Sequence, residues 1–139
     1  MDAIELLSAD HERVLALLEQ LESGSIEADP NDLRVRRDLV TALVIAVSQH
    51  EAVEEQYFWP AVRALVPDGA RLAAHAMEQE REAERTLARL EKLSADESEF
   101  ERLVVRVIAD GRAHIAYEQD NVWRKLRENG DGAGDAETR

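Results

Sequence analysis

Apolar residues recur at three- and four-residue intervals through four segments of the chain, which is the period of an amphipathic helix. The segments cover about residues 2–22, 32–66, 69–93 and 94–128. Polar stretches with glycine or proline separate them, as in SGSIEADPN after the first segment and VPDG after the second. No run of β-branched residues alternates with polar ones as in a strand. The pattern predicts an all-α fold, an antiparallel up-down-up-down four-helix bundle.

Local signals mark some of the helix ends. Asp32 is a plausible N-cap of the second helix, and Ser94 or Asp96 could cap the fourth. Pro60 lacks the N–H that the preceding turn needs, so the sequence predicts a kink or an early end near Trp59.

The four histidines lie one on each predicted helix, within its apolar stripe, at a repeated spacing. The first and second are 39 residues apart, and so are the third and fourth, at an offset of 64. HEAVEEQYFW (50–59) aligns with HIAYEQDNVW (114–123), sharing the histidine, the glutamate four residues on and the tryptophan nine residues on. This indicates an internal αα-hairpin duplication that places four histidines around a pseudo-twofold axis: His11, His50, His75 and His114.

The amino-acid composition argues against several classes of function. The net charge of −13 argues against nucleic acid or an anionic membrane surface as partner, because both need a basic face. The chain has no cysteine, which excludes disulfides, thiol catalysis and thiolate metal ligands. Its acidic start lacks the features of a signal peptide, so we expect a cytoplasmic protein. We expect one bundle domain over 1–128 and a disordered, glycine-rich tail over 129–139.

A glutamate follows two of the histidines by four residues, which places each pair one turn apart on the same helix face. The pairs are His50 with Glu54 and His114 with Glu118. Burying unpaired carboxylates costs several kcal/mol each, and the stripes offer no Lys or Arg at that level. A dinuclear site for divalent cations would resolve this, with carboxylates bridging the ions and histidines capping each one.

Imidazole and carboxylate ligands without sulfur suit Fe, Mn, Zn, Ni or Cu, and bridging carboxylates favour redox-active iron. The Glu-x-x-His pattern of ferritin-like di-iron proteins is excluded. The residues three positions before the histidines are Ser8, Val47, Leu72 and Gly111.

The chain resembles the hemerythrin-like family, the HHE cation-binding domains, over about residues 1–128. The matching motifs are Asp10-His11, His50-x-x-x-Glu54-Glu55-x-x-Phe58-Trp59-Pro60, His75 and His114-x-x-x-Glu118. The resemblance implies that His11 and His50 bind one iron and that His75 and His114 bind the other. It also implies that Glu54 and Glu118 bridge the two irons, with an oxo or hydroxo group between them. Zn or Mn could occupy the same ligands.

One position departs from the pattern of the oxygen-carrying hemerythrins. They have a further histidine four residues after the third-helix ligand, where this chain has Gln79. Glu51 is a candidate replacement, because it lies about 100° round the helix from His50 and could reach the neighbouring metal. A similar His-Glu-x-x-Glu arrangement occurs in the iron-sensing hemerythrin domain of a mammalian ubiquitin-ligase subunit. The alternative is that Glu51 is a flanking surface charge.

Several neighbouring residues have structural interpretations. We expect Tyr57 and Tyr117 on the inner face near the metals, as packing or hydrogen-bonding groups, and Trp59 and Trp123 as closures of the core. Asp10 is either a solvated charge or an acceptor for a ligand histidine. Solvated helix faces are expected for Glu55, Glu78, Glu80 and Glu82.

These features predict a non-haem di-iron binding protein that engages O2 or a related small ligand, NO or peroxide, at an open iron position. Two alternatives use the same site. One is an enzyme that disposes of peroxide or NO. The other is a regulatory module whose fold responds to iron or oxygen, since an empty site leaves buried carboxylates and histidines without partners.

Overall fold

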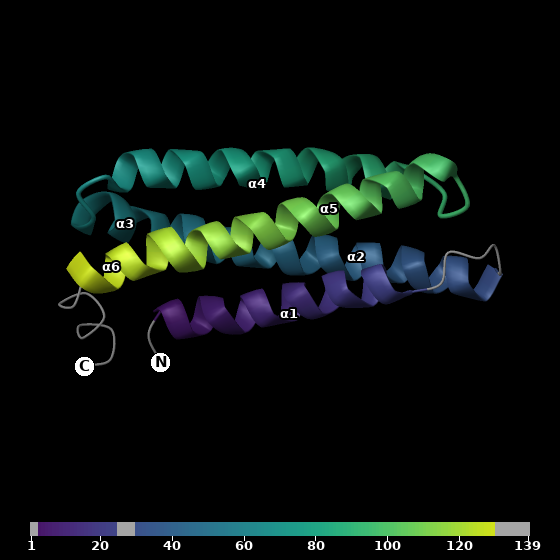
Figure 1. The fold of residues 1–139 in the computed structure, drawn as a ribbon, viewed down its shortest axis with the longest axis horizontal. Helices are drawn as coiled ribbons and strands as arrows, with labels where there is room; N and C mark the ends of the chain where they lie inside the picture. The colour runs from purple at the N-terminus through teal and green to yellow at the C-terminus, as the bar shows by residue number, and fades with distance from the viewer. Residues whose placement is uncertain (1–2, 25–29, 130–139) are drawn as a thin grey trace.

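Four long helical rods run alternately up and down in the computed structural model, which describes residues 3–24 and 30–129 (Figure 1). No strand occurs within those two ranges. The first rod is α1 (Ala3–Ser23). The second consists of α2 (Pro30–Val53), η1 (Glu54–Phe58) and α3 (Trp59–Leu65). The third is α4 (Gly69–Lys92), and the fourth consists of α5 (Ser98–Tyr117), η2 (Glu118–Trp123) and α6 (Arg124–Asn129). The predicted four-helix bundle is confirmed.

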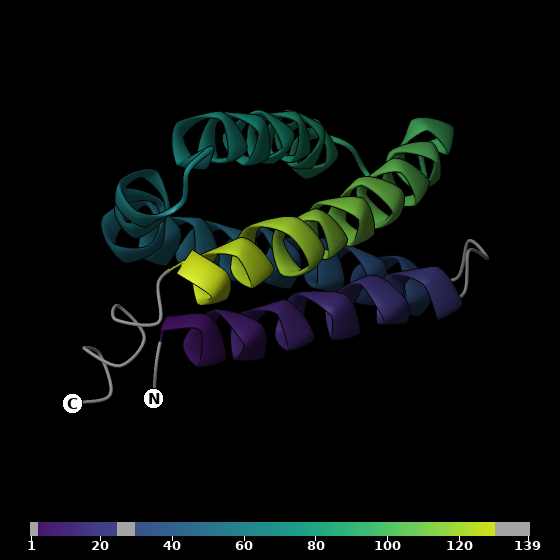
Figure 2. The same cartoon turned by 60° about the vertical axis from the view of Figure 1, so that its left-hand side comes forward.

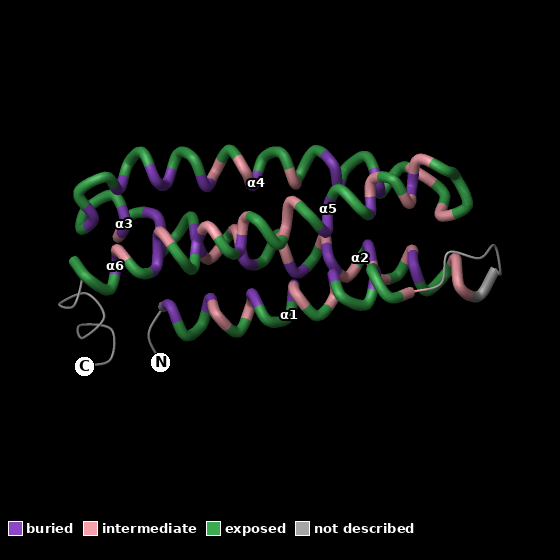
Figure 3. Tube along the Cα trace, in the orientation of Figure 1, coloured by how far each residue is buried: buried purple, intermediate pink, exposed green. Residues whose placement is uncertain are grey.

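The rods pack as two antiparallel pairs. α1 lies along α2 and along α5, and α4 lies along α5 and more loosely along α2. Figure 2 shows α1 and α2 side by side beneath α5, with α4 on the far side of it. The start of α1, α3 and α6 gather at one end of the bundle (Figure 1). Each rod turns its buried positions inward about once per turn (Figure 3).

Helix ends differ slightly from the predictions. α2 begins at Pro30, so Asp32 lies inside its first turn and is not its N-cap. α5 begins at Ser98 after Glu97, and neither Ser94 nor Asp96 caps it. The predicted tail over 129–139 lies outside the described residues except for Asn129, the last residue of α6.

The second and fourth rods each contain a π-helical segment that begins at the glutamate of the repeated motif. η1 begins at Glu54 and η2 begins at Glu118, at the same offset of 64 as the histidines. In η1 the backbone N–H of Trp59 donates to the carbonyl of Glu54, five residues back. The rod continues through Pro60 because this wider turn rearranges the hydrogen-bond ladder where the proline removes a donor.

Two apolar clusters fill the core, and polar side chains separate them. The Phe100 cluster occupies the end where α4 meets α5, and its members include Leu18, Leu43, Leu90 and Phe100. The Trp59 cluster occupies the end with α3 and α6, and its members include Leu7, Phe58, Trp59, Val122 and Trp123. Trp59 and Trp123 are buried, as predicted for residues that close the core. Between the clusters lie buried histidines and glutamates.

Candidate metal centre

Three histidine rings and two carboxylates meet at the middle of the bundle. They come from α1, α2, η1, α5 and η2, so three of the four rods converge on one point. The glutamates Glu54 and Glu118 are both 0% exposed. The histidines His11 and His50 are buried, and His114 is partly buried.

These five side chains form two overlapping groups whose ligand atoms lie within 4.8 Å of one another. The first group is His11, His50 and Glu118, and the second is Glu54, His114 and Glu118. His11 Nε2 lies 3.0 Å from Glu118 Oε1, and His114 Nε2 lies 3.3 Å from the same oxygen. Glu118 therefore belongs to both groups, as a bridging carboxylate would. Glu54 links them as well, because its Oε2 lies 3.5 Å from His50 Nε2.

The three rings share one orientation. Each turns Nε2 inward, and His11 Nε2 and His50 Nε2 lie only 3.1 Å apart. Each faces a polar side chain with Nδ1: Asp10 Oδ2 at 3.1 Å for His50, Gln79 Oε1 at 2.8 Å for His114, and the Gln119 amide at 3.2 Å for His11. For His50 and His114 the partner is an acceptor, and an outer acceptor at Nδ1 that leaves Nε2 free for a cation is typical of metal-binding histidines. Of the two roles expected for Asp10, the structure therefore favours that of an acceptor for a histidine, here His50.

Several inward atoms have no hydrogen-bond partner among the described residues. Both carboxylate oxygens of Glu54, Oε2 of Glu118 and Nε2 of His114 are in this position. Buried polar atoms are nearly always satisfied in folded proteins, and leaving one without a partner costs about 1–3 kcal/mol. The unpartnered atoms here are three carboxylate oxygens and one imidazole nitrogen, which are ligand atoms for a divalent transition metal. The residues present therefore fit a metal centre.

The two glutamates differ in their affinity for protons. Burial raises the pKa of Glu54 well above its usual range, and the facing carboxylate of Glu118 raises it further. Burial also acts to raise the pKa of Glu118, but Glu54 and the surrounding histidine rings lower it well below its usual range. Burial lowers the pKa of His11. It acts in the same way on His50, where Glu118 and Asp10 outweigh it and raise the pKa. The raised pKa favours the protonated form of Glu54, and a cation that binds there competes with that proton.

The sequence comparison agrees with this geometry. The family model described as hemerythrin HHE cation binding domain matches residues 2–126 of the 139. The chain belongs to this family. Membership implies metal-ion binding, and the His/Glu cluster lies within the matched range. Comparisons with curated proteins and with solved structures give no significant match. In the described part of the chain, no helix is both long and apolar enough to cross a membrane.

This HHE domain does not bring every predicted ligand into the cluster. His75 is exposed, so the expectation that it faces the interior is wrong: Ala73 and Ala76 take the buried positions on either side of it. Its ring packs edge-on against Tyr117, with centroids 4.7 Å apart. Tyr57 was also expected on the inner face, but it is 60% exposed. Its neighbour Phe58 is buried instead, because the π-helical turn changes which residues face inward.

Glu51 and Glu80 line a small cavity beside the cluster. The cavity measures about 60 Å³, and its wall also includes His50, His114 and Ala83. Burial and the neighbouring Glu84 and Glu80 raise the pKa of Glu51 to about 10. Its predicted role as a ligand stays a prediction.

Glu80 is the site residue that sequence reasoning missed. It was assigned to a solvated face, yet it is only 8% exposed, and burial raises its pKa. The available signal was its place in the α4 stripe, four residues after Ala76, which is itself four residues after Leu72. Because Glu78 and Glu82 lie two residues away on either side, Glu80 was grouped with them as an exposed charge.

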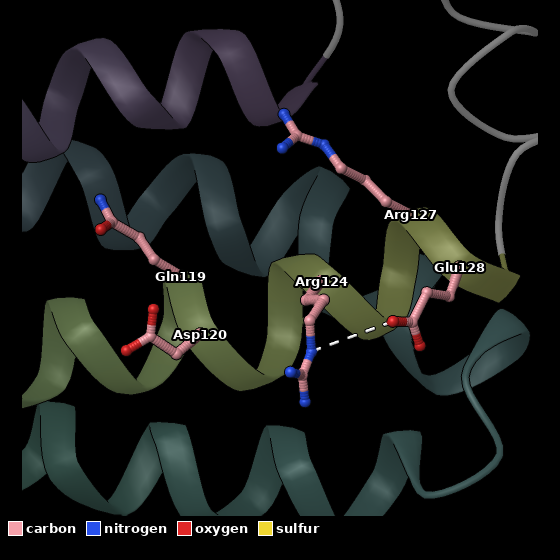
Figure 4. A pocket seen from close by; sticks show the side chains of 5 residues that line it. All are labelled: Gln119, Asp120, Arg124, Arg127 and Glu128. Atoms are coloured by element: carbon pink, nitrogen blue, oxygen red, sulfur yellow. Dashed lines mark ion pairs between the residues drawn. The ribbon is translucent and has the colours of Figure 1, made fainter.

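A second hollow lies on the surface of η2 and α6 and does not belong to the centre (Figure 4). It is lined by Gln119, Asp120, Arg124, Arg127 and Glu128. Arg124 Nε lies 3.9 Å from Glu128 Oε1 in an exposed ion pair. Such pairs contribute little to stability, and this hollow has none of the unpartnered buried atoms that mark the metal centre.

Proposed function

We propose that this HHE domain binds two non-haem iron ions and engages O2 or a related small ligand, NO or peroxide. The observation that carries the proposal is the pair of ligand groups that share Glu118, with the oxygens of Glu54 unpartnered between them. Two cations would satisfy those atoms in one arrangement. Donors that are all imidazole or carboxylate, in a chain without cysteine, favour iron among the candidate metals.

The residues that would hold the ions follow from the two groups. His11 and His50 would cap one ion, His114 the other, and Glu54 and Glu118 would bridge them. When bound, the iron pair supplies electrons and an open coordination position for a small ligand. Glu51, on the cavity wall, is proposed as a further donor. Replacing Glu51 with alanine should then lower metal occupancy or change the optical spectrum, and no change in either would remove it from the ligand set.

The chain's own side chains prepare the site. Asp10 and Gln79 face Nδ1 of His50 and His114, which keeps the ring proton there and leaves an Nε2 lone pair pointing inward. The His11 ring stacks on Trp123, with centroids 4.6 Å apart and planes 12° apart, which restricts its rotation. The Phe100 and Trp59 clusters exclude water from both ends of the site.

The cavity beside the cluster supports the binding of a small ligand. Its volume of about 60 Å³ leaves room for a molecule of the size of O2 or peroxide, since a cavity of about 10–15 Å³ already holds one water. Val14, Val47, Ala83 and Ile115 provide apolar walls. Uncharged diatomic ligands partition readily into such a space.

An experiment on the iron-loaded chain tests this function. The wild-type protein is loaded and kept under anaerobic conditions, and its optical spectrum should change when O2, NO or peroxide is then added to separate samples. Ala83→Leu narrows the cavity without replacing a proposed ligand, so it should keep the metal content and slow the spectral change. A loaded protein that responds to none of the three molecules would refute the proposal.

A further inference from the structure

The third rod contributes one buried carboxylate to the centre of the bundle. The inward stripe of α4 runs through Leu72, Ala76, Glu80 and Leu87, all of which are buried. Glu80 therefore stands where an apolar residue would be expected. A buried carboxylate needs a partner, because burial of an isolated charge is costly.

The surroundings of Glu80 contain acidic groups and imidazoles. It lines the same cavity as His50 and His114, and its charge acts on Glu54 and on Glu118. No basic side chain neutralises this region: among the buried polar residues that the structure describes, Arg36 alone carries a fixed positive charge. Arg36 is engaged at the other end of the bundle, where its Nε donates to Glu101 Oε2 at 2.5 Å.

The other polar candidates of α4 are turned away or already engaged. His75 is exposed and rests against Tyr117. Gln79 accepts a hydrogen bond from His114 Nδ1 at 2.8 Å and so faces the outer side of that ring. Glu80 is thus the α4 donor that is both buried and directed to the cavity. The unpartnered oxygens of the fully buried Glu54, next to it, independently point to a ligand at this place.

We propose that Glu80 is the α4 ligand of the second metal ion, in the role that the family resemblance gives to His75. This inference rests on the proposed function. The second ion would then have one imidazole, His114, and three carboxylates, whereas the first has two imidazoles. With Glu51, four carboxylates would balance the charge of two divalent ions. The pair is therefore asymmetric, and its oxygen-rich side favours harder cations such as Mn²⁺ or Fe²⁺.

Metal counting on three variants of the full chain tests this assignment. Each protein is loaded anaerobically with Fe(II), desalted and analysed for iron, and its helicity is checked by circular dichroism. Glu80→Gln should retain one iron where the wild type retains two, and His75→Ala should retain both. Glu91→Gln is the matched control, because Glu91 is an exposed glutamate on the same helix. Glu80→Gln removes a buried charge, so we expect it to fold.

The outcomes separate the two claims. A wild type with two irons and a Glu80→Gln variant that also keeps two would overturn the assignment of Glu80 alone. A wild type that takes up no iron would overturn the proposed function and this inference with it. Loading with Co(II) gives a second measurement, because its visible absorption reports ligand number. The spectrum of Glu80→Gln should differ from the wild type if Glu80 is a ligand, and an identical spectrum would also count against it.

Discussion

Replacing Glu54 with methionine should stabilise the metal-free protein while removing its ability to bind two ions. Glu54 is 0% exposed, and neither of its carboxylate oxygens has a hydrogen-bond partner among the described residues. Methionine has a similar volume and shape without polar oxygens, so it relieves that cost without opening a cavity. Residues of a binding site often lower the stability of the protein without its ligand, and we expect Glu54 to do so in the metal-free protein.

The size of the effect follows from the burial of one polar group. An unsatisfied buried group costs about 1–3 kcal/mol, and burial raises the pKa of Glu54, which favours the neutral form of its carboxyl group. A domain of this length shifts its melting temperature by about 4 °C per kcal/mol. We therefore expect Glu54→Met to melt roughly 4–12 °C higher than the wild type when both are free of metal.

Thermal melting in a chelator, followed by circular dichroism, measures this shift. Glu55→Met is the matched control, because Glu55 is the exposed neighbour of Glu54 and should change stability by less than about 0.5 kcal/mol. With metal present, the wild type should melt at the higher temperature of the two. A ligand at a thousandfold excess over its dissociation constant adds about 4 kcal/mol to the free energy of unfolding of the protein that binds it. A metal-free Glu54→Met protein that melts lower than the wild type would refute the reasoning.

Three further predictions concern the surroundings of the site. Asp10→Ala and Gln79→Ala should each lower metal affinity by about 10–100-fold in a competition titration, because they remove the Nδ1 partners of ligand histidines; unchanged affinity would show that other contacts orient the rings. The melting temperature of the metal-free protein should fall as the pH rises from about 5 to about 8. In the unfolded chain the Glu51 carboxyl loses its proton above about pH 4.5, whereas in the folded protein its pKa is raised to about 10 and it keeps the proton. Glu51→Gln should flatten that dependence, and a wild-type stability that rises over this range would contradict it. Glu101→Ala should destabilise the loaded and the empty protein alike, by about 3 kcal/mol, because it leaves Arg36 buried without its carboxylate; its iron content should stay as in the wild type, and a loss of iron would mean that the two ends of the bundle are coupled.

The helices were predictable because their signals are local. Helical periodicity over twenty or more residues, with glycine and proline between the segments, placed α1 and α4 to within about two residues of their observed ends. The duplication was visible as well, and the structure extends it, since both π-helical segments begin at the repeated glutamates.

The π-helical segments were missed, although the sequence carries a signal for them. Buried residues follow one another at strict four-residue spacing in the second rod: His50, Glu54, Phe58, Val62 and Val66. Each such step overshoots a full turn of an α-helix by about 40°, so four steps would turn the last residue well away from the core. One extra residue in a π-helical turn restores the phase. His114, Glu118, Val122 and Leu126 repeat the spacing.

The inward face of α4 was harder to predict, because the sequence allows two sets of inward positions that differ by one residue. His75 lies next to the buried Ala76, and about 100° of rotation separates a core position from an exposed one. Spacing from Leu72 alone permits either three or four residues to the next inward position. The packing of α4 against α5 decides the phase, and it places Glu80 inward and His75 outward.

An anaerobic Fe(II) titration of the metal-free wild-type chain, with iron analysis after desalting, tests the central claim most directly. The two ligand groups that share Glu118 predict that two equivalents are retained per chain. Saturation at two irons, with melting at a higher temperature than the metal-free protein, is the expected result. A chain that stays free of iron and melts at the same temperature with and without Fe(II) would contradict the account.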